Sequence, residues 1–203
     1  MSPKALTGII AIGLVLLIGL VLLFSGISTY NKMVRLDENV TEKWAQVEND
    51  YQRRADLIPN LVKTVRSYAE YEQETLTEVV EARAKATSVT VDPSNLNAQS
   101  IQQFQQAQEG LNSALSKLLV VVEKYPDLKA NQNYLDLQRQ LEGTENRISN
   151  ARRKFNEGTR EYNGYIKRFW PRMLASWFGF EEKAYFEAKE GAEEVPDVGD
   201  YLD

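Results

Sequence analysis

The feature that most constrains this chain is an uninterrupted apolar run from Leu6 to Phe24, LTGIIAIGLVLLIGLVLLF. No charged side chain occurs between Lys4 and Lys32. A helix rises about 1.5 Å per residue, so about 20 apolar residues can cross the roughly 30 Å hydrocarbon layer of a bilayer. The run therefore predicts a membrane-spanning helix. Its large apolar side chains are those of Leu6, Ile9, Ile10, Ile12, Leu14, Val15, Leu16, Leu17, Ile18, Leu20, Val21, Leu22, Leu23 and Phe24.

A cleaved signal peptide is the alternative interpretation, because the small residues Ser25, Gly26 and Ser28 follow the run. The apolar core of a signal peptide is usually only about 7–15 residues long. The length of this run and the single lysine in front of it, Lys4, favour an anchor that stays in the mature protein. The chain contains no cysteine to which a lipid could be attached.

The basic residues that flank the run bear on its orientation, because cytoplasmic flanks carry an excess of lysine and arginine. Lys4 and the amino terminus precede the run, whereas Lys32, Arg35 and Lys43 follow it. This small excess predicts that the body of the protein lies on the cytoplasmic side of the membrane.

The composition excludes several classes of function. The chain has neither histidine nor cysteine, so nucleophile–histidine triads and metal sites built on these two residue types cannot form. Di-metal sites in helical bundles use Glu-x-x-His pairs, which carboxylates such as Glu142 and Glu145 cannot complete without histidine. The net charge of -5 and the lack of a sustained basic stripe argue against nucleic acid as a partner. We therefore expect neither a cofactor nor an enzymatic activity.

Beyond the run, apolar residues keep a helical spacing from Tyr30 onward. The chain after Ser28 has no proline before Pro59, so we expect the membrane helix to continue into a long first helix that ends near Ala86. A proline inside a helix removes a backbone donor and clashes with the preceding turn, which predicts a kink or local irregularity over residues 55–59. The apolar stripe of this helix consists of Val40, Trp44, Val47, Tyr51, Ile58, Val62, Val65, Ala69, Leu76 and Val80.

Two further helices follow. Residues 87–97, TSVTVDPSNLN, predict a loop that ends in a helix cap, and Pro126 ends the second helix at Tyr125. The second stripe consists of Ile101, Phe104, Leu111, Leu115, Leu118 and Val122. The third helix starts near Asp127 or Lys129, and its stripe consists of Tyr134, Leu137, Leu141, Ile148, Ala151, Phe155, Tyr162 and Ile166.

The predicted fold class is therefore all-α. A single transmembrane helix at the amino terminus continues into an elongated antiparallel bundle of three long helices, and a shorter helix follows. The anchor covers residues 1–28 and the bundle residues 29–180. Residues 181–203 form an acidic tail that we expect to be extended or disordered.

Polar side chains share the third helix with its apolar stripe, and a second polar group surrounds Pro59. Asparagine is unfavourable inside helices, so its presence near a core suggests hydrogen bonds between helices that fix their register. The alternative is a polar site for a ligand or a partner helix. The residues concerned are Arg53, Arg54, Asp56, Pro59 and Asn60 in the first helix and Asn131, Glu145, Asn146, Arg147, Arg152, Asn156 and Asn163 in the third.

An aromatic cluster follows the third helix, in the segment FWPRMLASWFGF. It consists of Phe169, Trp170, Met173, Leu174, Trp177, Phe178 and Phe180. Such a cluster can cap the core of the bundle or lie in the membrane interface, where tryptophan collects. With three long helices the chain leaves the bilayer, returns and leaves again, so we expect the cluster far from its own membrane. This geometry favours core capping, or contact with another protomer or another bilayer.

Three segments resemble the LemA family of bacterial membrane proteins: DLIPNLVKTV (residues 56–65), KANQNYLDLQRQLEGTENRISNARRKFNE (129–157) and REYNGYIKRFWP (160–171). The likeness covers nearly the whole chain in order. It implies a bacterial inner-membrane protein with one amino-terminal membrane helix and a long antiparallel bundle. It implies no catalytic residue, and a relative in magnetosome formation implies, by analogy only, a link to the shaping of internal membranes.

Two hypotheses for the function remain. The first is a non-enzymatic scaffold that forms a homo-oligomer and organises or remodels the bilayer, with the aromatic cluster as a candidate contact surface. The second is a tethered adaptor or receptor that binds another membrane protein, such as a protease or a sensor kinase. Large regular assemblies of the full-length protein would favour the first, and dispersed protomers the second.

Overall fold

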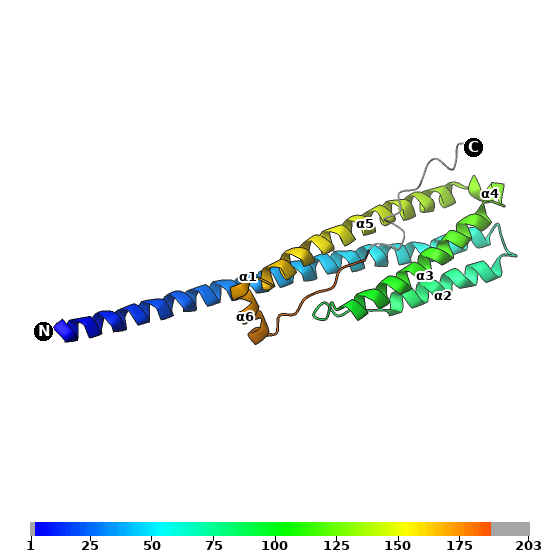
Figure 1. Ribbon diagram of the computed structural model, residues 1–203. Helices are drawn as coiled ribbons and strands as arrows, with labels where there is room; N and C mark the ends of the chain where they lie inside the picture. Colours follow the sequence, from blue (N-terminus) through cyan, green and yellow to red (C-terminus); the bar gives the residue numbers. More distant parts are fainter. Residues whose placement is uncertain (1–2, 188–203) are drawn as a thin grey trace, which may run out of the picture.

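The computed structural model describes residues 3–187, and over this range the chain forms α-helices and no strand. The helices are α1 (Pro3–Arg66), α2 (Gln73–Ser88), α3 (Ala98–Val122), α4 (Pro126–Lys129), α5 (Gln132–Ile166) and α6 (Phe169–Phe178). α1 runs the length of the molecule, and α2, α3 and α5 lie alongside its second half (Figure 1). The predicted all-α bundle is confirmed, and the three long helices correspond to α1, α3 and α5.

An additional helix, α2, comes from a reversal of the chain that the sequence did not predict. α1 ends at Arg66, and the expected continuation of this helix to Ala86 is wrong. The turn at residues 67–72 contains no glycine or proline. It is held instead by the backbone amides of Tyr68 and Ala69, which both donate to the carbonyl of Val65 at 3.0 Å.

One residue of the first predicted stripe, which lies after this turn, is not buried. Val80 was expected on the apolar stripe but is 47% exposed, whereas Val79 is fully buried. The apolar spacing therefore continues across the turn in the sequence even though the helix does not. The other stripe residues are buried, apart from the half-buried Leu115 and Leu141.

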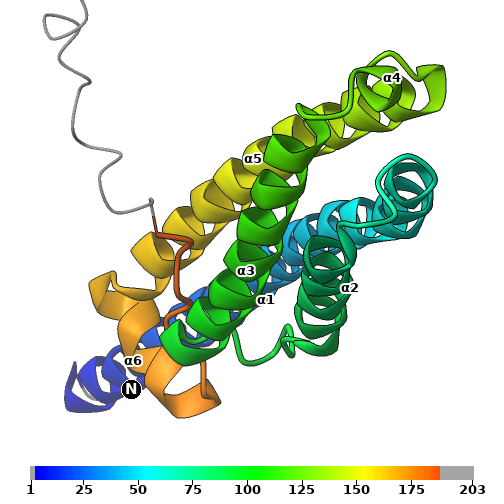
Figure 2. The same ribbon diagram turned by 90° about the vertical axis from the view of Figure 1, so that its right-hand side faces the viewer.

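The extra reversal changes which end of the bundle the chain finally reaches. α1 leads away from the amino-terminal apolar segment, α2 returns, α3 leads away again and α5 returns (Figures 1 and 2). α6 therefore lies beside α1 at the end of the bundle nearest the anchor. The expectation that the aromatic cluster lies far from its own membrane is wrong. It assumed that the chain runs along the bundle three times, whereas α1, α2, α3 and α5 run along it four times.

α1 continues through Pro59, because α2 replaces the donor that the proline lacks. A residue with an N–H at this position would donate to the carbonyl four residues earlier, which is that of Ala55. In the structure Arg83 Nε, from α2, donates to the Ala55 oxygen at 2.7 Å. The acceptor that Pro59 leaves free is thus satisfied from a neighbouring helix, and the helix does not end there.

We expect Arg83→Met to lower the free energy of unfolding by about 1–2 kcal/mol, because it leaves the Ala55 carbonyl without a donor. Pro59→Ala restores the backbone donor, so Arg83→Met should cost less in the Pro59→Ala background. Chemical denaturation of the four proteins in mild detergent measures this difference. Equal costs of Arg83→Met in both backgrounds would show that Arg83 does not compensate for the proline.

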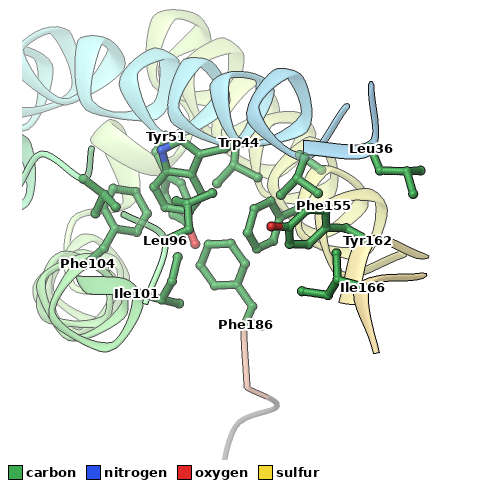
Figure 3. Packing of buried hydrophobic residues seen from close by; sticks show 14 of the residues in the cluster. Leu36, Trp44, Tyr51, Leu96, Ile101, Phe104, Phe155, Tyr162, Ile166 and Phe186 are labelled. Carbon is green, nitrogen blue, oxygen red and sulfur yellow. The ribbon is translucent and has the colours of Figure 1, made fainter. Parts of the chain in front are cut away.

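Two clusters of buried apolar side chains fill the bundle. The distal cluster lies around Ile58, Val65, Leu76, Leu111 and Leu118. The membrane-proximal cluster is rich in aromatic rings and brings together α1, α3, α5 and the extended chain after α6 (Figure 3). At its centre the Trp44 ring centroid lies 5.2 Å from that of Phe104, 5.4 Å from that of Phe155 and 5.8 Å from that of Phe186.

Candidate functional site at the membrane-proximal end

The described part of the chain contains one helix that is long and apolar enough to cross a membrane, namely α1 near its amino terminus. Each large apolar side chain from Ile12 to Phe24 is at least half exposed, so no other part of the described chain covers this segment. Leu6, Ile9 and Ile10 lie in the same helix. The predicted membrane-spanning residues thus form one continuous apolar rod that projects from the bundle (Figure 1).

α6 contacts α1 and α5 where this rod meets the bundle. The rings of Phe178 and Phe180 meet the Tyr30 ring edge-on, at centroid distances of 4.9 and 5.8 Å. Pro171 and Ala175 are the buried residues of α6. This contact positions α6 beside the part of α1 that follows the apolar run.

Gly179 ends α6 and turns the chain back along the bundle. Its φ of +75° lies in the left-handed region, which glycine enters without the steric cost that a Cβ imposes. Its amide donates to the carbonyl of Ala175. The chain can therefore leave the helix at once and continue as an extended segment.

The aromatic cluster divides into a face that contacts the bundle and a face that does not. Phe169, Met173 and Trp177 recur every four residues and so form one stripe along α6. Their exposed fractions are 83%, 56% and 86%. Trp170, Leu174 and Phe180 are half-buried, and Phe178, although 56% exposed, contacts Tyr30. The stripe therefore has no partner within the described chain.

Basic side chains accompany the stripe. Arg168 and Arg172 are exposed on either side of Phe169 and Pro171 in the sequence. The ring of Tyr165 is approached by Lys32 Nζ at 4.7 Å and by the Arg168 guanidinium at 5.5 Å. Lys167 Nζ forms an ion pair with Glu182 at 2.7 Å. The end of the bundle near α6 thus combines exposed apolar rings with several cations.

Residues 181–187, which we call the strap, run in an extended conformation along the bundle. The side-chain amide of Asn163 donates to the Lys183 carbonyl at 2.8 Å and accepts from the Lys183 amide at 3.0 Å. Asn156 makes the same pair of hydrogen bonds to Phe186, at 3.0 and 2.9 Å. The two asparagines are seven residues apart and therefore share one face of α5. Both bind the strap rather than another helix.

Side chains of the strap also reach the bundle. Lys183 Nζ forms an ion pair with Asp37 of α1 at 2.8 Å, and the Lys183 side chain is buried. Tyr162 donates from its hydroxyl to the Glu181 carbonyl at 2.9 Å. Burial, followed by the nearby charges of Asp37 and Glu181, raises the pKa of Tyr162. The phenol therefore stays protonated, and keeps this hydrogen bond, even at an alkaline pH at which an exposed tyrosine ionises.

A second polar centre surrounds Arg54, which is 2% exposed. Its guanidinium donates to Asn112 and Gln108 of α3, the latter at 2.9 Å, and to Glu145 of α5 at 3.1 Å. Gln108 Nε2 in turn donates to the Ala86 carbonyl of α2 at 3.1 Å. One buried arginine of α1 is thus connected to α3, α5 and, through Gln108, α2.

The remaining predicted polar residues lie nearer the surface. Asn131 caps α5, accepting from the Tyr134 amide at 3.1 Å and donating to the Tyr68 hydroxyl at 2.8 Å. Arg152 donates to the Glu187 carbonyl at 3.0 Å and lies over the Phe186 ring. Besides Glu145, the exposed members of the set are Arg53, Asp56, Pro59, Asn60, Asn146 and Arg147. That the polar set fixes helix register remains a prediction.

Sequence reasoning missed four residues that hold these centres together: Arg83, Gln108, Lys183 and Phe186. The burial of Gln108 could have been predicted from the sequence, because this residue lies four positions after Phe104 and therefore continues the apolar stripe of α3. Lys183 and Phe186 lie in the segment whose acidic composition suggested a tail. Among the residues that the structure describes, no three acidic side chains gather closely enough to hold a metal ion.

The fold and the exposed apolar rod define a class of protein: a helical bundle with one amino-terminal helix that is long and apolar enough to cross a membrane. The chain belongs to the LemA family, whose family model matches residues 43–199. This confirms the family indicated by the sequence motifs. The family and the apolar helix together make the chain a membrane-associated protein.

Three relatives illustrate the likeness. Protein LemA of Metamycoplasma hominis is 25% identical over 163 residues, with 79% of this chain and 69% of that protein covered. Magnetosome protein MamQ of Magnetospirillum gryphiswaldense is 28% identical over 180 residues, with 79% and 65% covered. Magnetosome protein MamQ 2 of Paramagnetospirillum magneticum is 27% identical over 180 residues, with the same shares covered. The chain thus spans just under two thirds of each magnetosome protein.

Proposed function

We propose that this chain is a non-enzymatic, membrane-anchored scaffold, copies of which associate laterally and organise or remodel the bacterial membrane. The observation that carries the proposal is the continuity of α1, a single helix of 64 residues that contains both the anchor and the first helix of the bundle. At about 1.5 Å per residue such a helix is about 95 Å long. A tilt of the anchor in the bilayer is therefore transmitted directly to the bundle, and forces on the bundle are transmitted to the bilayer.

The relatives and the composition support the same proposal. None of the three relatives has a name that denotes a reaction, and two are magnetosome proteins by name. The chain has no histidine and no cysteine, which removes the commonest acid–base and nucleophilic groups. A mechanical role requires neither acid–base groups nor nucleophilic groups.

We place the contact between copies in the anchor, whose large apolar side chains from Ile12 to Phe24 are exposed. Gly13 and Gly19 have no atom within 4 Å of the position that an added Cβ would occupy. A larger side chain there disturbs nothing within one protomer, but it keeps neighbouring anchors apart. The Gly13→Leu, Gly19→Leu double variant should therefore reduce the assembly without unfolding the bundle.

Light scattering and negative-stain microscopy of the full-length protein in mild detergent and in nanodiscs test the proposal. We expect large regular rings, shells or arrays, and smaller particles for the Gly13→Leu, Gly19→Leu variant. Gly110→Leu is the matched control, since this exposed glycine of α3 is also free of neighbours but lies outside the anchor. Dispersed single protomers of the unsubstituted protein would contradict the scaffold and favour a tethered adaptor.

We further propose that the anchor crosses the inner membrane with the bundle in the cytoplasm, on the evidence of Lys32, Arg35 and Lys43. The absence of native cysteine allows a direct test with Ser113→Cys, at an exposed position of α3. An impermeant maleimide should label this variant only after the inner membrane of spheroplasts is permeabilised. Labelling of intact spheroplasts would place the bundle on the other side.

A further inference from the structure

We propose that α6 lies in the interfacial layer of the same bilayer that α1 crosses. In this arrangement the stripe of Phe169, Met173 and Trp177 inserts among the lipid headgroups and the upper parts of the acyl chains. The inference goes beyond the scaffold function, because insertion of α6 requires no second copy of the chain. Its partner is a phospholipid surface.

The height of α6 along α1 is the first argument. Tyr30, which contacts Phe178 and Phe180, lies six residues after Phe24, the last residue of the apolar run. Six residues of helix rise about 9 Å. The headgroup region on each side of the hydrocarbon layer is roughly 5–8 Å thick. The contact with Tyr30 therefore holds α6 at the level where α1 leaves the headgroups.

The direction of the stripe is the second argument. Pro171 and Ala175 form the buried side of α6, which packs against α1 and α5. At 100° per residue, the stripe lies on roughly the opposite side of the helix from these two residues. α6 crosses the long axis of α1 at the anchor end of the bundle (Figure 1). The apolar side chains therefore face away from the protein core.

The composition of α6 is the third argument. Helices that lie in a membrane interface combine an apolar face rich in aromatic residues with basic side chains beside it. Tryptophan is enriched at this depth because its ring is apolar and its N–H is polar. Arg168 and Arg172 are exposed beside the stripe, where they can meet anionic lipid headgroups. Glu182 is paired with Lys167.

A second copy of the chain is the other possible occupant of this surface. A lipid surface is favoured because the contact between Phe178 and Tyr30 holds α6 beside an anchor whose large apolar side chains from Ile12 to Phe24 are themselves at least half exposed. A protein contact would shield Trp177 from water without bringing it near lipid. The two occupants therefore give different results in a quenching experiment.

The test uses the full chain reconstituted at one copy per nanodisc, in phosphatidylethanolamine and phosphatidylglycerol that carry bromine on the upper acyl chain. The Trp177 emission is obtained by subtracting the spectrum of Trp177→Phe, which leaves Trp44 and Trp170 in place. We expect the Trp177 emission to be strongly quenched relative to unbrominated lipid, and to be protected from aqueous acrylamide. In a Trp170→Phe, Trp177→Phe variant, the buried Trp44 supplies a reference signal that neither quencher should reach.

Trp177 that is quenched by acrylamide but not by brominated lipid would overturn the proposal, because the stripe would then face water. Trp177 that becomes shielded from both quenchers only when several copies share a liposome would also overturn it, in favour of a second copy. Phe169→Ser with Met173→Ser should reduce quenching by brominated lipid while leaving the helical circular dichroism unchanged. Because each disc holds a single copy, failure of the scaffold proposal does not affect the result.

Discussion

Replacement of Phe186 by alanine is expected to lower the free energy of unfolding by about 3–5 kcal/mol. The Phe186 ring is 4% exposed and comes from the strap, outside every helix. It stacks on Trp44 with an interplanar angle of 16° and lies 5.5 Å from the Phe155 centroid (Figure 3). The guanidinium of Arg152 covers it at 4.7 Å. Alanine would leave a cavity between rings that belong to different helices.

Chemical denaturation of the full chain in mild detergent, followed by circular dichroism, measures this loss. Phe169→Ala is the matched control, because it makes the same chemical change at a ring that is 83% exposed. We expect the control to change the free energy of unfolding by no more than about 0.5 kcal/mol. Faster hydrogen exchange at the Lys183 and Phe186 amides should accompany Phe186→Ala. Equal stability of the two variants would mean that the strap is not part of the folded core.

The strap shows what composition alone could not predict, namely that part of the acidic segment packs into the core. Acidic residues dominate the sequence after Phe180, which is typical of a tail that cannot form a core of its own. The strap does not need a core of its own. Side chains of α5, above all Asn156 and Asn163, form hydrogen bonds with its backbone, and its one buried ring enters a core built by the helices. Residues 188–203, the rest of the predicted tail, lie outside the described residues. A preference for disorder can therefore be reversed locally by a partner that is distant in sequence.

The positions at which helices end were also hard to predict from the local sequence. Pro59 is the strongest helix breaker in the body, yet α1 passes through it because Arg83 supplies the missing donor. The turn at residues 67–72 has no breaker, yet the helix ends there. In both places tertiary contacts override local preference, which is a weak predictor of structure. Apolar periodicity did predict most of the core, because burial of an apolar face is what stabilises these helices.

The location of the candidate site depended on the number of chain reversals. The sequence identified the aromatic segment and placed it on a short helix, as observed for α6. Its distance from the membrane could not be derived from local signals, since one undetected turn moves α6 from one end of the bundle to the other. The anchor could be predicted without knowing the number of chain reversals, because a long uncharged apolar run is recognised from its composition alone.

Replacement of Arg54 by methionine should lower the free energy of unfolding by about 2–4 kcal/mol. Methionine keeps an unbranched side chain and the helical preference, so the loss reports mainly on the guanidinium. Without it, the buried Gln108 oxygen and the Asn112 oxygen lose their donor. Glu145→Gln should cost only about 1 kcal/mol or less, because Glu145 is 57% exposed and water can solvate what remains.

Arg53→Met is the matched control for Arg54→Met, since it makes the same change at the adjacent, exposed position of α1. We expect the control to lie within about 0.5 kcal/mol of the unsubstituted protein. Denaturation in mild detergent ranks the variants. If Glu145→Gln proved as costly as Arg54→Met, the ion pair rather than the hydrogen bonds to α3 would be the main contribution.

The double variant Arg54→Met, Gln108→Met tests whether this centre fixes helix register. Replacing both partners of a buried hydrogen bond by apolar groups costs less than removing one, so the double variant should be more stable than the sum of the single changes predicts. An all-apolar contact permits more than one alignment of the helices. If the polar contacts specify register, the double variant should therefore lose the near-ultraviolet circular dichroism of Trp44 even though part of its stability is restored. A double variant that keeps the native near-ultraviolet spectrum would show that apolar packing alone sets the register, and that Arg54 contributes stability without specificity.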